Sequence, residues 1–274
     1  MSTHEVELTR TVRCCIPLDE TTWTNQPRNN TFAGWPSMTG IGLYAELDVT
    51  VRGRPDPTTG YLVGIQDIDA LVRSRALPIL SRTVRERPTT PAECALREMA
   101  RACIDHTDLP IVRFGWRLTP FYRLELETAS MTADPTTEPA TVLYRQQFEF
   151  AAAHRLHCDD LSDDENRRIF GKCNNRNGHG HNYRLEVIVE APLTDRPAFG
   201  LGRLEAIVRE HVVDRFDHTN LSLDVEEFAD CNPSVEHIAR VCHDRLINPL
   251  RDAGAALRNV TVWETEKTAC TYPP

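Results

Sequence analysis

The same order of hydrophobic patterns occurs twice in this chain, on either side of a segment rich in threonine, proline and alanine. That segment, residues 128–141, shows no periodicity and predicts a linker. In each flanking half, period-2 and helical spacings predict two strands, two helices and two more strands. The predicted ranges are 7–16, 43–51, 68–77, 92–104, 111–118 and 121–127 in the first half, and 146–153, 181–190, 204–216, 235–246, 259–264 and 270–272 in the second. The repeated order indicates an internal duplication.

A ββααββ unit predicts an α+β fold in which an antiparallel four-stranded sheet carries both helices on one face. We therefore expect two tandem units, at residues 1–127 and 142–274, joined by the linker. An open sheet leaves two edges unpaired, and association of such sheets into barrels would cover them. The pattern predicts a homo-oligomer.

Composition narrows the classes of function. The net charge of -9 and the pI near 5.6 argue against a general nucleic-acid or membrane surface. Nine cysteines without a C-x-x-C pair favour a reducing compartment over a disulfide framework. No apolar run is long enough to span a bilayer, and residues 1–10 lack the apolar core of a signal peptide. These features predict a cytoplasmic protein.

Residues 170–183 carry the most specific chemistry, because Cys173 comes shortly before His179 and His181. If a strand begins there, the two histidines project from one face. His154, at the end of the preceding predicted strand, could add a third imidazole. Three imidazoles leave one tetrahedral position of a zinc ion open to substrate, with the Cys173 thiol available as an acid or base.

Three other places could contribute to such a site. Asp217 directly precedes His218 after the first helix of the second half, where it could orient a proton-shuttling imidazole or only cap a turn. Glu236 follows Ser234 at the start of the next helix, where a carboxylate also suits the helix dipole. Glu264 interrupts an apolar strand and could accept paired hydrogen bonds from the N–H and NH2 groups of a flat heterocycle.

Taken together, residues from about 145 to 272 resemble the 6-pyruvoyl-tetrahydropterin synthase family, most specifically in LSDDENRRIFGKCNNRNGHGHNY. The resemblance implies a T-fold and a Zn2+ ion held by His154, His179 and His181. It also implies a substrate, 7,8-dihydroneopterin triphosphate, which would lose triphosphate to give 6-pyruvoyl-tetrahydropterin. The roles it implies are acid–base thiol for Cys173, proton relay for Asp217 and His218, pterin anchor for Glu264, and pterin contact for Ser234 and Glu236.

Alternatives remain open at this level. A 6-carboxytetrahydropterin synthase of the queuosine pathway would use the same substrate and site residues but release acetaldehyde. A non-catalytic pterin- or metal-binding protein is a different class. Arg155, Lys172 and Arg176 are the nearest cations for a triphosphate, and they could equally be solvated surface charges.

The first half lacks counterparts of the three predicted zinc ligands. Gly40-Ile41-Gly42-Leu43 stands where the His-Gly-His stretch would be, and no Asp-His pair follows the first helix. Cys14 and Cys15 lie near the position of the first histidine. We therefore expect a degenerate unit that keeps the fold without the catalysis, although it could bind its own ligand through Glu93 or the loop at 23–35. Because relatives form rings of T-folds, the resemblance implies a trimer of two-domain chains, a pseudo-hexamer, with all second units in one ring.

Overall fold

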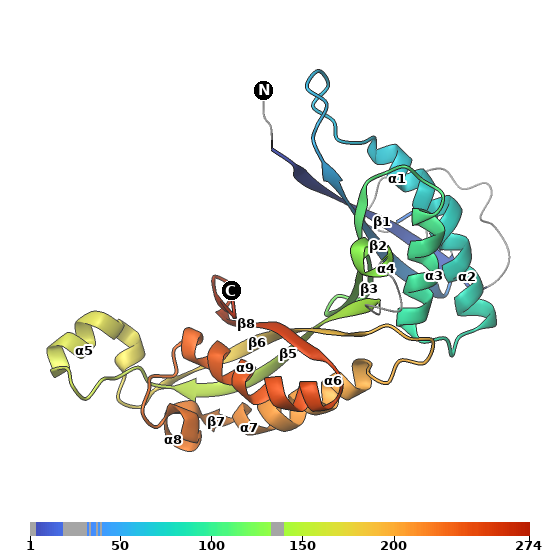
Figure 1. Ribbon diagram of the computed structural model, residues 1–274. Coiled ribbons are helices and arrows are strands. Elements are labelled where there is room, and N and C mark those ends of the chain that lie inside the picture. The colour runs from blue at the N-terminus through green and yellow to red at the C-terminus, as the bar shows by residue number, and fades with distance from the viewer. Residues whose placement is uncertain (1–3, 19–31, 33, 37, 39, 133–139) are drawn as a thin grey trace. The chain divides into compact units, whose positions relative to one another are not determined.

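The computed structural model describes residues 4–18, 32, 34–36, 38, 40–132 and 140–274. The chain forms two compact units, which Figure 1 shows as sheets carrying helices. Unit 1 comprises Met1–Leu143 with Pro192–Pro197, and unit 2 comprises Tyr144–Ala191 with Ala198–Pro274. Within the predicted linker, Thr128–Thr132 forms the short helix α4, and residues 133–139 lie outside the described residues. The boundaries at 127 and 142 stay a prediction.

Unit 1 contains an antiparallel arrangement of strands in the order β1-β2-β3-β4. Their bounds are Val6–Pro17, Gly42–Gly53, Ile111–Thr119 and Tyr122–Glu127. The β1–β2 pairing runs from Val6↔Gly53 to Pro17↔Gly42. Alternate β2 side chains (Ala45, Leu47, Val49 and Val51) are fully buried, as expected for a strand with one face on the core.

The helices of unit 1 pack on one face of this sheet (Figure 1). They are α1 (Ile65–Leu71), α2 (Leu77–Glu86), which follows it through a π-helical turn at Val72–Ala76, and α3 (Ala92–Ile104). The helix predicted at 68–77 is therefore longer in the structure. Leu77 and Leu80 continue its buried stripe, so packing extends the helix beyond the predicted end.

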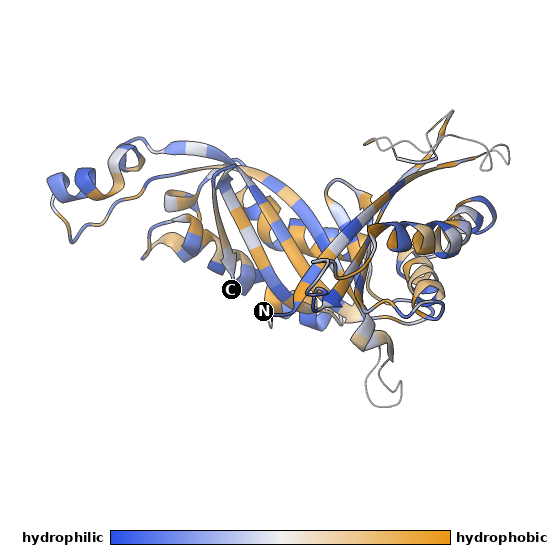
Figure 2. Ribbon diagram, turned by 90° about the horizontal axis from the view of Figure 1, so that it is seen from above, coloured by the Kyte–Doolittle hydropathy of each residue, from blue (hydrophilic) through white to orange (hydrophobic). Residues whose placement is uncertain are grey.

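Unit 2 has its strands in the order β5-β6-β8-β9, and the short β7 pairs in parallel with β5. The strand bounds are Thr141–His154, His179–Pro192, Ala256–Thr265, Thr268–Tyr272 and, for β7, Thr219–Asn220. Hydrophobic and hydrophilic residues alternate along the strands (Figure 2). The mixed α and β composition and the antiparallel pairing agree with the predicted class. Duplication of one unit and closure into a barrel stay predictions.

The main helix of unit 2 is α9 (Val235–Asp252), which packs on β8 and β9 through Ile238, Cys242 and Leu246. The other helical segments are α6 (Leu201–Val208), a π turn (Arg209–Val213), α7 (Asp214–Phe216), α8 (Leu221–Asp224) and a 3-10 turn (Glu226–Phe228). No helix in the described part of the chain has the length and apolarity needed to cross a bilayer.

The longest of the helices that were not predicted lies between β5 and β6. Residues 163–170, expected to belong to a polar loop, form α5 (Asp163–Phe170), followed by a 3-10 turn at Gly171–Asn174. Ser162 and Glu165 form a capping box, in which the Glu165 N–H donates to Ser162 Oγ at 3.3 Å and the Ser162 N–H donates to Glu165 Oε2 at 3.0 Å. The S-x-x-E spacing was the available signal. Because α5 buries only Asn166, the helix depends on this cap for much of its stability.

Removal of the cap should loosen α5. We expect Ser162→Ala to destabilise this helix by about 1 kcal/mol, because the Glu165 N–H loses its acceptor. Hydrogen exchange of the α5 amides should then become about fivefold faster. Ser74→Ala is the control, since Ser74 Oγ donates only to the Leu71 carbonyl within a helical segment. Unchanged α5 exchange in Ser162→Ala would contradict this account of the helix.

Candidate active site

Three imidazoles converge where β5 ends and β6 begins. His154 is the last residue of β5, and His179 and His181 are the first and third residues of β6. Gly178 precedes them with φ of 70°, and a Cβ there would lie 2.8 Å from the His154 carbonyl oxygen, so only glycine fits this close approach. Strand alternation then turns His179 and His181 toward the same side as His154. One ligand atom from each of the three histidines lies within 4.8 Å of the others.

One pair of donor atoms is spaced as a tetrahedral metal requires. His154 Nε2 lies 3.2 Å from His179 Nε2. Two nitrogens each bound to zinc at about 2.0–2.1 Å would lie about 3.3 Å apart. His181 Nε2 is buried and has no hydrogen-bond partner among the described residues. A divalent cation would satisfy these nitrogens, so the residues fit the zinc ion that the sequence predicts.

The surroundings of His154 favour its metal-binding form. The ring is fully buried, and its Nδ1 lies 2.7 Å from the Pro233 carbonyl oxygen. Because a carbonyl only accepts, Nδ1 carries the proton and Nε2 presents a lone pair to the other imidazoles. Burial lowers the pKa of His154, and likewise that of His181, which keeps both rings neutral.

Two contacts of this cluster were missed by sequence reasoning. The Pro233 carbonyl is a backbone group, which leaves no signal in residue type. Tyr183 is fully buried, and its hydroxyl lies 3.4 Å from His154 Nδ1. Burial raises the pKa of Tyr183, so the phenol stays protonated. Its position two residues after His181 was the signal, because alternate residues of a strand share a face.

Cys173 lies in the 3-10 turn Gly171–Asn174, which is bonded to the segment that follows His154. The Leu156 N–H donates to the Cys173 carbonyl at 2.9 Å, and Arg155 Nε donates to the Asn174 carbonyl at 3.4 Å. Asn174 Nδ2 lies 2.7 Å from the Leu156 carbonyl and 2.9 Å from His157 Nδ1. Partial burial and then the Glu264 carboxylate raise the pKa of the Cys173 thiol. The protein groups alone therefore favour the protonated thiol, and thiolate character needs a nearby cation.

Glu264, on β8, lies against the imidazoles. Its Oε1 is 3.4 Å from His154 Nε2 and 3.6 Å from His181 Nε2. From the sequence, Glu264 is predicted to bind a flat heterocycle. The structure shows that it lies beside the histidine cluster. Ser234 is the N-cap of α9, with its Oγ 3.5 Å from the His237 N–H, and Glu236 lies in the first helical turn. A hydrogen bond from Ser234 lowers the pKa of Glu236.

Asp217 and His218 form a pair of their own. Asp217 Oδ1 accepts from the Ala151 N–H at 2.7 Å, and Oδ2 lies 2.7 Å from His218 Nδ1. These hydrogen bonds lower the pKa of Asp217. The His218 side chain is 83% exposed and its φ is 59°. Within the described residues, no hydrogen bond or ion pair connects this pair to Cys173.

A cationic cavity of about 910 Å³ adjoins the histidine cluster through His179. Arg155, Lys172 and Arg176, all noted in the sequence, line it together with Arg167. Arg167 was missed because the sequence did not reveal α5, which carries it. Asp163 is the one carboxylate in the described lining, so the cavity is net positive in a chain whose net charge is -9.

Unit 2 is similar to proteins of known function. The family model for 6-pyruvoyl tetrahydropterin synthase matches residues 143–274. The 6-pyruvoyl tetrahydrobiopterin synthase of Drosophila melanogaster is 38% identical over 137 residues, which cover 49% of this chain and 80% of that protein. The one from Homo sapiens is 39% identical over 131 residues, covering 46% of this chain and 88% of that protein.

A solved structure, the Caenorhabditis elegans 6-pyruvoyl tetrahydropterin synthase, is 36% identical and covers 49% of this chain and 96% of its own, with a TM-score of 0.45. The curated relatives match over most of their own length at more than a third identity. Through its second half, the chain belongs to the 6-pyruvoyl tetrahydropterin synthase family.

Proposed function

We propose that this chain is a zinc-dependent lyase that converts 7,8-dihydroneopterin triphosphate to 6-pyruvoyl-tetrahydropterin with loss of triphosphate. The observation that carries the proposal is the convergence of His154, His179 and His181, with one ligand atom of each within 4.8 Å of the others. Burial and Glu264, whose Oε1 lies 3.4 Å from His154 Nε2, raise the pKa of the Cys173 thiol, which supports a role for that thiol beside the cluster. The names of the curated relatives support the same activity.

His154, His179 and His181 would hold the zinc ion. When bound, zinc would acidify the side-chain hydroxyls of the substrate and stabilise negative charge that develops next to them. The Pro233 carbonyl fixes the His154 ring at 2.7 Å, so the ring keeps its orientation as substrate enters and leaves. Glu264, Glu236 and Ser234 would contact the pterin, with carboxylates accepting from its N–H and NH2 groups.

Cys173 would carry protons between the ring and the side-chain carbons of the substrate. In this role Asp217 accepts the Nδ1 proton of His218, which leaves His218 Nε2 free to exchange a proton with the thiol or the substrate. Because the His218 ring is 83% exposed on its own chain, we propose that it completes the site of a neighbouring chain. This supports a homo-oligomer, a trimer of two-domain chains in which the second units share one ring.

The cavity beside His179 would receive the triphosphate. We expect Arg176→Gln to raise KM for the triphosphate substrate about tenfold, because it removes a charge-assisted hydrogen bond, while kcat changes little. Steady-state kinetics would measure both constants. Arg168→Gln is a matched control, since Arg168 is exposed on α5 and is not among the residues that line the cavity. A lowered kcat with unchanged KM would place Arg176 in another role.

Product analysis tests the proposed reaction. The purified chain, loaded with zinc, is incubated with 7,8-dihydroneopterin triphosphate, and pterins, triphosphate and acetaldehyde are measured. Formation of 6-pyruvoyl-tetrahydropterin and triphosphate without acetaldehyde is the expected result. Acetaldehyde would instead assign the 6-carboxytetrahydropterin synthase reaction, which the same residues could support. Stoichiometric zinc with no turnover would favour a non-catalytic binding protein.

We propose that unit 1 keeps the fold without a metal site. Ile41, at the position compared with the His-Gly-His stretch, has 86% of its surface exposed, and burial raises the pKa of Cys14 to about 12. In the described part of the chain, the histidine cluster of unit 2 is the one group of three side chains suited to a metal. The expected content is one zinc per chain. The loop at 23–35 falls mostly outside the described residues.

A further inference from the structure

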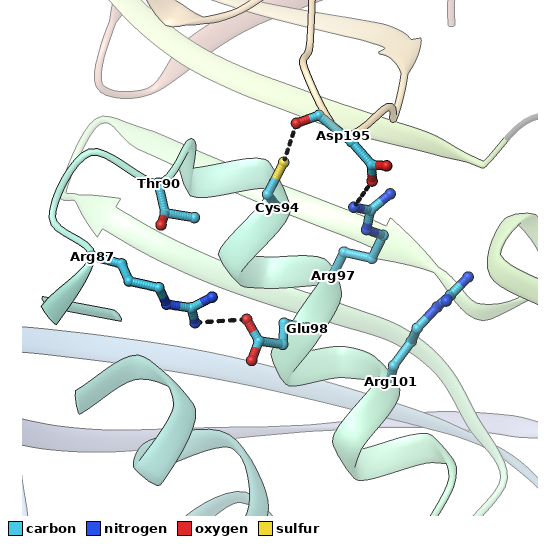
Figure 3. A pocket seen from close by; sticks show the side chains of 7 residues that line it. All are labelled: Arg87, Thr90, Cys94, Arg97, Glu98, Arg101 and Asp195. Carbon is cyan, nitrogen blue, oxygen red and sulfur yellow. Dashed lines mark hydrogen bonds and ion pairs between the residues drawn. The ribbon is translucent and has the colours of Figure 1, made fainter. Parts of the chain in front are cut away.

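Unit 1 has a cavity of its own, with a volume of about 380 Å³ and several charged residues in its lining (Figure 3). The loop between α2 and α3, the α3 helix and the segment Pro192–Pro197 line the cavity. Its lining residues are Arg87, Thr90, Cys94, Arg97, Glu98, Arg101 and Asp195. Cys94, Arg97, Glu98 and Arg101 are spaced at i, i+3, i+4 and i+7, so they share one face of α3.

Positive charge exceeds negative charge in this cavity. Arg82 and Arg87 both bind Glu98, at 2.8 Å each, and Arg97 binds Asp195 at 2.6 Å. The Arg101 side chain lines the cavity and has no hydrogen-bond or ion-pair partner within the described residues, whereas its carbonyl accepts from the Asp105 N–H at 2.9 Å. The cavity lining therefore holds three guanidinium groups and two carboxylates, in a chain whose net charge is -9, and Arg82 pairs with Glu98 from outside the lining.

The counter-ion of Arg97 is poorly held. The Arg97 side chain is 24% exposed, whereas the Asp195 side chain that pairs with it is 92% exposed. An ion pair with a solvated carboxylate contributes little free energy, so another anion can take its place. In Figure 3 the Arg97 and Arg101 side chains extend from the same side of α3, and a dashed line joins the Asp195 carboxylate to Arg97.

We propose that this cavity binds a small molecule bearing two or three linked phosphates. Guanidinium forks match phosphate oxygens in two-point fashion, and Arg97 and Arg101 would supply the main contacts after Asp195 is displaced. A volume of 380 Å³ holds about twelve waters at roughly 30 Å³ each, which is more than one phosphate group occupies. The site uses residues of unit 1 alone and does not depend on the reaction proposed for unit 2.

The full-length protein allows a direct test with inorganic triphosphate, pyrophosphate and phosphate as probes, followed by calorimetry at low and moderate salt. Triphosphate should bind most tightly and weaken as salt rises. Arg97→Gln and Arg101→Gln should each weaken binding about tenfold. Asp195→Asn should strengthen binding severalfold, because it removes the carboxylate that competes for Arg97. Arg54→Gln, an equal change of charge at an exposed loop residue outside the cavity, should have no effect.

Cys94 provides a local readout. Its Sγ lies 3.5 Å from the Thr194 carbonyl and 3.7 Å from the Asp195 carbonyl, inside the same cavity. Bound triphosphate should slow alkylation of Cys94, measured peptide by peptide by mass spectrometry. Unprotected Cys94, or equal affinity in wild type, Arg97→Gln and Asp195→Asn, would overturn the proposal. Binding that disappears only in Arg176→Gln would assign the anion to the cavity of unit 2 instead. The gain expected for Asp195→Asn cannot arise from misfolding.

Discussion

Replacing Cys173 with alanine is expected to lower kcat by about 10²- to 10⁴-fold, the range typical of a lost acid–base group. KM should change little, because the metal ligands and the cationic cavity stay in place. The turn should also keep its position, since its hydrogen bonds to residues 155–157 use the Cys173 and Asn174 backbone and the Asn174 side chain. Product formation from 7,8-dihydroneopterin triphosphate measures the effect.

The matched controls separate the thiol from its surroundings. Cys158→Ala removes another half-buried thiol in unit 2 whose described contacts use only its backbone groups, so activity should be retained. Cys173→Ser keeps an ionisable hydroxyl with a much higher pKa and should have a low but measurable rate. Full activity in Cys173→Ala would remove Cys173 from the proposed mechanism while leaving the zinc site untouched.

Replacing His179 with alanine is expected to abolish both stoichiometric zinc and turnover. Its Nε2 lies 3.2 Å from His154 Nε2, so its loss leaves two of the three imidazole ligands. Because loss of a residue that only supports a ligand weakens metal binding about 10- to 100-fold, loss of a ligand should exceed about 100-fold. Zinc content after dialysis and competition with a chelator measure the affinity without reference to activity.

His211→Ala is the control for this change, because His211 is a half-buried histidine of unit 2 outside the cluster. It should retain one zinc per chain. Chelation of the wild-type protein should remove activity, and added Zn2+ should restore it. Unchanged zinc content in His179→Ala would contradict the assignment of this cluster as the metal site.

Sequence periodicity was sufficient to locate the strands that carry the histidines. A strand repeats every two residues, so the spacing of His179 and His181 fixed a common face, and His154 followed from the adjacent strand of the predicted hairpin. Parts of the fold and of the site that depend on packing could not be predicted from the sequence. The helix predicted to end at 77 continues to Glu86, and α5 was hidden by its polar composition, because it buries little apolar surface.

Other features depend on the backbone or on the tertiary arrangement. The Pro233 carbonyl that orients His154 has no signature in residue type. The motif around Cys173 also could not predict the protonation state of the thiol. Burial and the charge of Glu264 raise the pKa of this thiol, and Glu264 lies ninety-one positions further along the chain. Asp217 and His218, adjacent in sequence, pair as expected, whereas the contact of this pair with the thiol of a neighbouring chain stays a proposal.

The hydrogen bonds between residues 155–157 and 173–174 have a mechanical consequence. They hold together the two ends of the excursion, which is the loop formed by residues 158–172. The turn that carries the thiol is thus tied by hydrogen bonds to the segment that directly follows the first imidazole. The excursion, α5 included, can gain or lose residues, or move as a large substrate passes, without altering the distance between the two groups. Catalytic geometry and access to the site can therefore evolve independently.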